Sequence, residues 1–506
     1  MDLFELRNKI DAIDENLVRL FLQRMDVSAE IARYKQENNI PIFDPERERQ
    51  KLNDMSSKVS EERSAYVTAL YSLLFELSRT EQERILQSVT TNPGRFGLLG
   101  ERLTHSFSPF IHAELGDYEY RLYEKKPEEV ESFLRNGDFD GLNVTIPYKK
   151  TVIPFCADLS ETAQKIGSVN TIIRREDGSL YGENTDYFGF SYLLTNAGVD
   201  VSEGKTIILG SGGSSVTARA VIQDMGSKEI VIISRNGEDN YENIEKHRDA
   251  AIIINTTPVG MYPNNGCSPI PDLDIFHTCK AVVDLIYNPD RTELLTQAGE
   301  RGIFTENGLV MLVAQAKKSA ELFTKSIIPD EKINSIAAKL THSTQNIVLI
   351  GMPGCGKTSI GSELAKKMGR EFADTDEWII ETTGKSIPAI FAENGEESFR
   401  EIERKALQTF CKRSGLVIAT GGGIVTRCEN RSIIRQNGTV IFLDRNVAEL
   451  PIAGRPLSEK EGIAALAAAR LPLYAKWSDF TVPVRGVEQT AQDIIEMFKE
   501  SCIKSS

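Results

Sequence analysis

The feature that most constrains this chain is a glycine-rich loop between a short apolar run and an expected helix. The apolar run Ile347-Val-Leu-Ile350 predicts a buried strand, and it is followed by Gly351-Met-Pro-Gly354-Cys355-Gly356-Lys357-Thr358. This is the P-loop pattern G-x-x-x-x-G-K-T, in which backbone N–H groups surround phosphate oxygens. Lys357 is expected to reach the β and γ phosphates, and Thr358 to offer its hydroxyl to Mg²⁺. Part of the chain is therefore expected to bind a nucleoside triphosphate such as ATP.

Length and charge limit what the rest of the chain can be. The 506 residues are too many for one hydrophobic core and predict about three domains. A net charge of -14 speaks against a nucleic-acid partner, and the seven cysteines contain no C-x-x-C pair that would suggest zinc. No apolar run approaches the roughly 18 residues of a membrane span, and the N-terminus does not resemble a signal peptide. We expect a cytoplasmic protein without a membrane partner, in which local arginines bind any anionic substrate.

An apolar heptad stripe dominates residues 1–90. It runs through Leu6, Ile10, Ile13 and Leu17 and is interrupted by Arg24. The implied helix is roughly 50 Å long, which is more than so small a domain can cover by itself. The pattern therefore predicts a homodimer. On the pattern alone this module could be a dimerising adaptor, in which Arg24 only sets the register.

Charged and polar residues around the stripe resemble those of the all-helical chorismate mutases, and the resemblance covers the whole segment. The matched positions are Arg7, Arg24, Lys35, Asp44, Arg47, Glu48, Ser78 and Gln82. The resemblance implies that arginines, one of them from the partner chain, hold the two carboxylates of chorismate. It also implies that Lys35 and Gln82 bind the ether oxygen and that Glu48 meets the ring hydroxyl. A pericyclic rearrangement needs confinement and well-placed donors, not a nucleophile.

A second glycine-rich loop lies near the middle of the chain. The strand-like run Lys205–Leu209 leads into a loop that departs from G-x-G-x-x-G because Ser215 replaces the third glycine. The loop residues expected to bind a dinucleotide are Gly210, Ser211, Gly212, Gly213 and Ser214. The next expected strand ends in Ser234-Arg235, and an arginine there favours the 2′-phosphate of NADP(H). Glu238 and Asp239 follow closely and leave NAD open.

The motifs around this loop resemble those of shikimate dehydrogenase. They include Ser106-Phe-Ser108-Pro, Asn143-Val-Thr145-Ile-Pro-Tyr-Lys149 and Asn307-Gly308. The residues that the resemblance places around 3-dehydroshikimate or shikimate are Ser106, Ser108, Thr145, Asn170, Asp186, Tyr287 and Gln315, and it places Gly308 at the cofactor. Lys149 and Asp186 would form the catalytic pair, because a protonated lysine can stabilise charge on a ketone oxygen and deliver its proton. Quinate oxidation and a catalytically inactive Rossmann relic stay open.

The segment after the P-loop resembles shikimate kinase. The resemblance implies that Asp374 helps Thr358 hold Mg²⁺, and that Asp376 orients the attacking hydroxyl of shikimate. The residues implied at the substrate carboxylate and the transferred phosphate are Arg400, Gly421, Gly422, Gly423, Arg455 and Arg470. The segment around Arg455 is shorter than usual, which bears on lid closure and adenine contacts. Gluconate or a nucleoside monophosphate would need a different partner for the arginines.

Together these patterns predict a multidomain chain. The expected order is an all-α mutase module at residues 1–90, a two-lobed α/β dehydrogenase at 94–338 with a Rossmann lobe at about 200–295, and a P-loop α/β kinase at 345–506. The segment Thr341–Gln345 is expected to be a short polar linker. The dehydrogenase and the kinase would act in consecutive steps, and the helical module would add dimerisation or end-product sensing.

Overall fold

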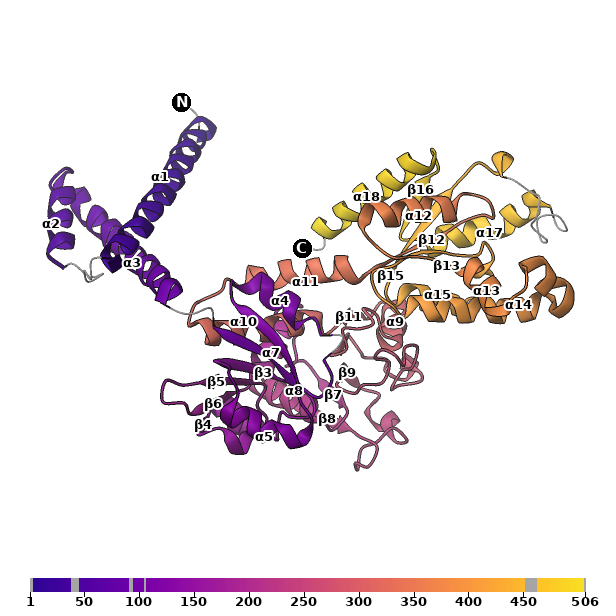
Figure 1. Ribbon diagram of the computed structural model, residues 1–506, viewed down its shortest axis with the longest axis horizontal. Helices are drawn as coiled ribbons and strands as arrows, with labels where there is room; N and C mark the ends of the chain where they lie inside the picture. Colours follow the sequence, from indigo (N-terminus) through magenta and orange to yellow (C-terminus); the bar gives the residue numbers. More distant parts are fainter. Residues whose placement is uncertain (1–2, 38–44, 91–93, 104–105, 451–461, 505–506) are drawn as a thin grey trace. The chain divides into compact units, whose positions relative to one another are not determined.

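The computed structural model describes residues 3–37, 45–90, 94–103, 106–450 and 462–504. It forms two compact units, Met1–Arg95 and Phe96–Ser506 (Figure 1). No helix within these ranges is both long enough and apolar enough to cross a membrane. The predicted fold class is confirmed in each of its three parts.

The first unit is helical. Its helices are α1 (Leu3–Glu37), α2 (Pro45–Ser56) and α3 (Glu61–Thr90). The apolar stripe of α1 is only partly covered within the unit: Ile13 is 62% exposed and Leu17 is 56% exposed. So many half-exposed large apolar side chains along one helix are unusual for a surface that faces water.

The second unit begins with a six-stranded sheet in the order β2-β1-β3-β5-β6-β4. Its strands are β1 (Arg95–Gly100), β2 (Glu119–Glu124), β3 (Gly141–Val144), β4 (Asp158–Leu159), β5 (Thr171–Arg174) and β6 (Leu180–Glu183). The helices of this lobe are α4 (Ser108–Leu115), α5 (Pro127–Asn136) and α6 (Glu161–Ile166). Buried apolar residues of β1, β3 and β5 meet those of α5 and α6 in one core.

A five-stranded parallel sheet follows, in the order β11-β10-β9-β7-β8. Its strands are β7 (Lys205–Leu209), β8 (Glu229–Ile233), β9 (Ala250–Asn255), β10 (Ala281–Asp284) and β11 (Phe304–Glu306). Helices of this region are α7 (Asp186–Asn196), α8 (Gly213–Asp224), α9 (Glu293–Glu300), α10 (Leu309–Thr324) and α11 (Glu331–Thr344). The strand order reverses at β7, which is where nucleotides bind in sheets of this type.

The third sheet is also five-stranded and parallel, in the order β13-β14-β12-β15-β16. Its strands are β12 (Asn346–Ile350), β13 (Phe372–Asp374), β14 (Val417–Ala419), β15 (Gly438–Asp444) and β16 (Phe480–Pro483). Its helices are α12 (Lys357–Met368), α13 (Thr375–Thr383), α14 (Ile387–Cys411), α15 (Glu429–Arg435), α17 (Ile463–Trp477) and α18 (Val487–Lys504). The central strand β12 leads directly into the P-loop.

The linker predicted at Thr341–Gln345 is wrong in one respect. Helix α11 continues through Thr344, and β12 starts at Asn346, so helix and strand are almost contiguous (Figure 1). The polar side chains are accommodated in the last turn of the helix, where Ser343 and Thr344 donate their hydroxyls to the carbonyl of Leu340.

Candidate active sites

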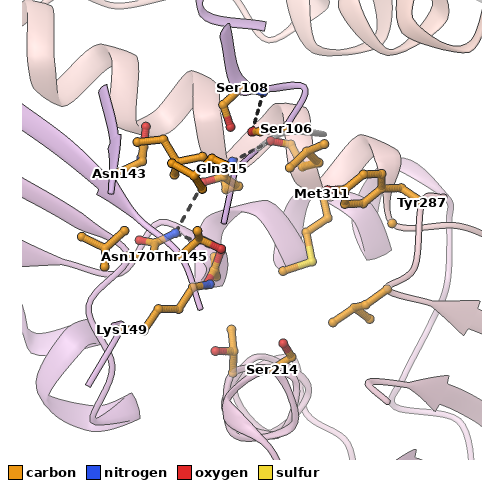
Figure 2. A pocket seen from close by; sticks show the side chains of 18 of the residues that line it. Ser106, Ser108, Asn143, Thr145, Lys149, Asn170, Ser214, Tyr287, Met311 and Gln315 are labelled. Carbon is orange, nitrogen blue, oxygen red and sulfur yellow. Dashed lines mark hydrogen bonds and ion pairs between the residues drawn. The ribbon is translucent and has the colours of Figure 1, made fainter. Parts of the chain in front are cut away.

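The first site is a cavity of about 590 Å³ that the two dehydrogenase lobes share. The predicted residues that line it are Ser106, Ser108, Thr145, Lys149, Asn170, Asp186, Ser214, Tyr287, Gly308 and Gln315. In Figure 2 the labelled side chains come from separate elements and gather around one space, with Ser214 on the helix at the bottom of the view. Residues scattered over more than 200 positions of sequence are therefore brought together.

Lys149 and Asp186 form an ion pair at this cavity. The Nζ of Lys149 donates to Oδ2 of Asp186 at 2.6 Å, and both side chains remain partly accessible. The Nδ2 of Asn170 donates to the other carboxylate oxygen of Asp186 at 2.9 Å. Asp186 is thus fixed from two sides, and it holds Nζ of Lys149 at the cavity.

Asn143 belongs to the cavity wall, although sequence reasoning quoted it only inside a motif. Its Nδ2 donates to Thr171 Oγ1 at 3.2 Å, and the hydroxyl of Tyr120 donates to its Oδ1 at 2.8 Å. Behind it, the ring of His112 stacks on Tyr120 with centroids 3.8 Å apart. Burial lowers the pKa of His112 to about 3, so this histidine is neutral. Asn143 and His112 could have been found from the sequence. Asn143 lies in the polar motif at the end of β3, and His112 lies in the motif that opens α4.

The glycine-rich loop predicted to bind a dinucleotide connects β7 to α8. Gly210 follows β7 with φ +104°, and Gly212 and Gly213 at the N-terminus of α8 have no heavy atom within 4 Å of where a Cβ would lie. The backbone of this loop is therefore open to a ligand at the positive end of a helix dipole. Gly308 is required for a different reason, because a Cβ there would lie 2.1 Å from the carbonyl oxygen of Leu285.

Arg235 is exposed in the loop after β8. Of the two acidic residues that left NAD open, Asp239 accepts a hydrogen bond at its Oδ1 from Nε2 of His247 at 2.9 Å. Its carboxylate is therefore already engaged by a neighbouring side chain.

The second site is a cavity of about 610 Å³ above the P-loop. The predicted residues that line it are Gly354, Gly356, Lys357, Thr358, Asp374, Asp376, Arg400, Gly421, Gly422, Gly423 and Arg470. Thr358 Oγ1 donates to Asp374 Oδ2 at 2.7 Å. One hydroxyl beside one carboxylate is the donor set that Mg²⁺ uses when a nucleotide supplies further oxygens. These residues therefore fit the metal.

Arg400 is the most enclosed cation of this site. Its side chain is 4% exposed, and its Nη1 donates to Oε2 of Glu403, which is 1% exposed, at 2.8 Å. Its Nη2 donates to Glu396 Oε1 at 2.9 Å. Glu403 was not predicted as a site residue, although its spacing of three from Arg400 places both on one helix face.

Asp376 is held beside these groups with its Oδ1 buried and without a hydrogen-bond partner in the described part of the chain. Burial, together with the negative charges of Asp374 and Glu403, raises the pKa of its carboxyl to about 6. Arg470 Nη1 donates to the carbonyl oxygen of Gly422 at 3.2 Å, so it fixes the glycine loop as well as facing the cavity.

The helical unit brings together part of the third predicted site. Arg24 Nη1 donates to the carbonyl oxygen of Leu74 at 3.0 Å and to the hydroxyl of Ser78. Gln82 is buried one turn further along α3, and its Oε1 has no partner among the described residues. Glu48 accepts from Nη1 of Arg79, which sequence reasoning missed, at 2.6 Å.

Three further predicted residues lie on the helices of this module. Arg7 is exposed on α1, and Lys35 and Arg47 lie on α1 and α2. Asp44 and Arg455 lie outside the described residues.

Comparison with known proteins identifies each region. Residues 6–83 match the family model of chorismate mutase type II, residues 98–172 that of the shikimate dehydrogenase substrate binding domain, and residues 353–499 that of shikimate kinase. The shikimate dehydrogenase (NADP(+)) of Clostridium perfringens is 36% identical over 249 residues, which are 45% of this chain and 91% of that protein. The chain belongs to the shikimate dehydrogenase family.

Other members of this family are equally similar. The shikimate dehydrogenase (NADP(+)) of Methanopyrus kandleri is 35% identical over 275 residues, covering 48% of this chain and 94% of the relative. A solved chorismate mutase/shikimate 5-dehydrogenase fusion protein from Clostridium acetobutylicum is 36% identical, covers 49% of this chain and 98% of its own, and has a TM-score of 0.47. Because the three family models match separate segments, the chain joins a chorismate mutase, a shikimate dehydrogenase and a shikimate kinase domain in one enzyme of the shikimate pathway, as the sequence predicted.

Proposed function

We propose that this shikimate dehydrogenase fusion catalyses three reactions at three separate sites. They are the rearrangement of chorismate to prephenate, the NADPH-dependent reduction of 3-dehydroshikimate to shikimate, and the ATP-dependent phosphorylation of shikimate. The observation that carries the proposal is the Lys149–Asp186 pair, which faces the same cavity as Ser214 of the nucleotide loop.

In the dehydrogenase site, Lys149 stabilises the charge that develops on the ketone oxygen and donates the proton to it. Asp186, held by Asn170, keeps the ammonium group charged and aimed. Ser106, Ser108 and the other polar groups of the lobe bind the substrate carboxylate and hydroxyls. NADPH supplies the hydride when it is bound, and Arg235 is the residue that would meet its 2′-phosphate. The engagement of Asp239 by His247 supports NADP over NAD.

In the kinase site, Asp376 accepts a hydrogen bond from the attacking hydroxyl, and its ionised form is the active one. Arg400 and Arg470 bind the substrate carboxylate, while Thr358 and Asp374 hold Mg²⁺. The metal neutralises charge on the phosphates when it is bound, and Lys357 adds a positive charge at the same place.

In the mutase site, Arg24 and Gln82 supply donors to chorismate, and Arg7 reaches this site from a second chain. We propose that the chain is a homodimer through α1. The half-exposed Ile13 and Leu17 support this, because a second helix would remove them from water.

One set of assays tests the three activities on the full-length chain. It is incubated with chorismate, with 3-dehydroshikimate and either NADPH or NADH, and with shikimate and ATP. We expect turnover in all three assays and a preference for NADPH. Turnover of quinate in place of shikimate, or no mutase activity in a dimeric chain, would contradict the corresponding part of the proposal.

A further inference from the structure

A third cavity lies where the dehydrogenase and kinase domains meet within the second unit. Its volume is about 440 Å³, and it is separate from the residues of both catalytic cavities. One wall comes from the loop after β10 and from β11 and α9, and the other comes from α15 of the kinase domain. A cavity of this size suits a small molecule.

Direct hydrogen bonds fix the two walls to each other. The backbone N–H of Arg291 donates to the carbonyl oxygen of Gln436 at 2.8 Å, and the backbone N–H of Asp290 donates to Oδ1 of Asn437, also at 2.8 Å. The Nη1 of Arg431 donates to Oε1 of Glu300 at 2.9 Å across the same boundary. The cavity is therefore built by residues from both domains.

Three guanidinium groups line this space. Arg431 and Arg435 are four residues apart and share one face of α15, and Arg291 approaches from the opposite domain. Burial and the like charges of Arg291 and Arg431 lower the pKa of Arg435. Each arginine uses only part of its five donors, and Nε of Arg431 is buried without a partner among the described residues.

Acidic groups line the same space. Asp290 accepts from Nδ2 of Asn307 at 2.9 Å and lies 3.9 Å from Nε of Arg291. Glu306, at the end of β11, has no hydrogen-bond or ion-pair partner for its carboxylate in the part of the chain that the structure describes. Burial, together with the negative charge of Asp290, raises the pKa of Glu306 to about 7.

The mixture of charges selects the class of ligand. The arginines would attract a simple anion, but Asp290, Glu300 and Glu306 would repel it. A simple cation would be attracted by these carboxylates and repelled by the arginines. A molecule with both a carboxylate and an ammonium group can satisfy both walls. We propose that this interdomain cavity binds a free amino acid, with its carboxylate on the arginines and its ammonium group on Glu306 and Asp290.

The test is calorimetric titration of the full-length chain with each of the twenty proteinogenic L-amino acids in turn, with saturating shikimate present. We expect at least one to bind once per chain. Its N-acetyl derivative and its amide, which lack the ammonium charge and the carboxylate, should each bind at least about tenfold more weakly.

Two variants connect binding to the cavity. Glu306→Gln and Arg291→Gln should each weaken the same titration by about tenfold or more, because each removes one charged contact. Neither side chain makes a hydrogen bond in the described structure, so folding should be retained, and this is checked by the melting temperature. Glu203→Gln, which removes an exposed carboxylate that pairs with Lys280 elsewhere, is the matched control and should bind normally.

Three results would overturn the proposal. The first is that no amino acid binds, and the second is that inorganic phosphate binds while amino acids do not, which would make this an anion site. The third is binding that Glu306→Gln and Arg291→Gln leave unchanged, which would place the ligand elsewhere.

Discussion

The substitution Gly423→Ala should disable the kinase through Arg400 without straining the backbone. Gly423 has φ -100° and ψ -4°, a conformation that alanine adopts freely. A Cβ at this position would lie 2.0 Å from Nη1 of Arg400, whereas ordinary contact begins at 3.4 Å. The guanidinium must therefore move by about 1.4 Å.

Such a movement would break the contacts that position Arg400. Its hydrogen bond to Glu403 is 2.8 Å long, and a displacement of this size would take it out of hydrogen-bonding range. A hydrogen bond to a charged group contributes about 1.5–3 kcal/mol, which corresponds to roughly a 10- to 100-fold loss. If Arg400 binds the substrate carboxylate, kcat/KM for shikimate should fall by that factor, mainly through KM.

The assay is steady-state kinase activity with varied shikimate, and the dehydrogenase activity of the same preparation is the internal control for folding. The double variant Gly423→Ala with Arg400→Ala should be no worse than Arg400→Ala alone, since both act on one group. A KM within twofold of the unsubstituted chain, or further loss in the double variant, would refute the reasoning.

Three further predictions concern the dehydrogenase, the kinase and the mutase module in turn. Lys149→Gln should lower the dehydrogenase kcat by about 10²- to 10⁴-fold while the kinase rate stays unchanged, which paired assays on one preparation would show. The kinase rate should fall as pH drops through about 6, because Asp376 loses its active ionised form. Glu403→Gln removes a negative neighbour and should therefore move the acid limb of the pH–rate profile to lower pH. An acid limb that does not move would contradict the assignment to Asp376. Replacing Ile13 and Leu17 together by glutamate should give the mass of a monomer in light scattering. Mutase activity should be lost, and the dehydrogenase and kinase activities should be kept. A variant that is still dimeric would count against α1 as the interface.

The sequence predicted the fold because the decisive signals are local. The P-loop lies between a strand and a helix, and so does the loop after Leu209. The kinase and dehydrogenase domains could therefore each be assigned from a short segment of sequence. The pairing of Lys149 with Asp186 came from a family resemblance, and the two residues do meet in the structure.

What the sequence could not provide is burial and long-range contact. Glu403 lies three residues after Arg400 in sequence, and no local pattern indicates that its side chain is almost fully enclosed beside Arg400. The interdomain cavity is lined by Arg291 and by residues of α15 that lie about 140 positions later in sequence. No local sequence pattern predicts that these residues are close in space. Helix α11 continues through Thr344, whose hydroxyl donates a hydrogen bond to a carbonyl group of the same helix. The polar composition of this segment predicts a linker instead.

The type of cationic side chain at each site, lysine or arginine, follows from the reaction proposed for that site. The dehydrogenase cavity pairs Lys149 with Asp186, and the proposed reduction requires a proton donor for the ketone oxygen, which a lysine can be. In the proposed kinase reaction Arg400, held by Glu403, needs only to present a fixed positive charge to the substrate carboxylate. In the mutase module Arg24 is held by a carbonyl and a hydroxyl instead of a carboxylate, which suits the proposed binding of a dianion. Exchange of Arg for Lys at the last two sites should therefore cost binding, whereas exchange of Lys149 for Arg should cost proton transfer.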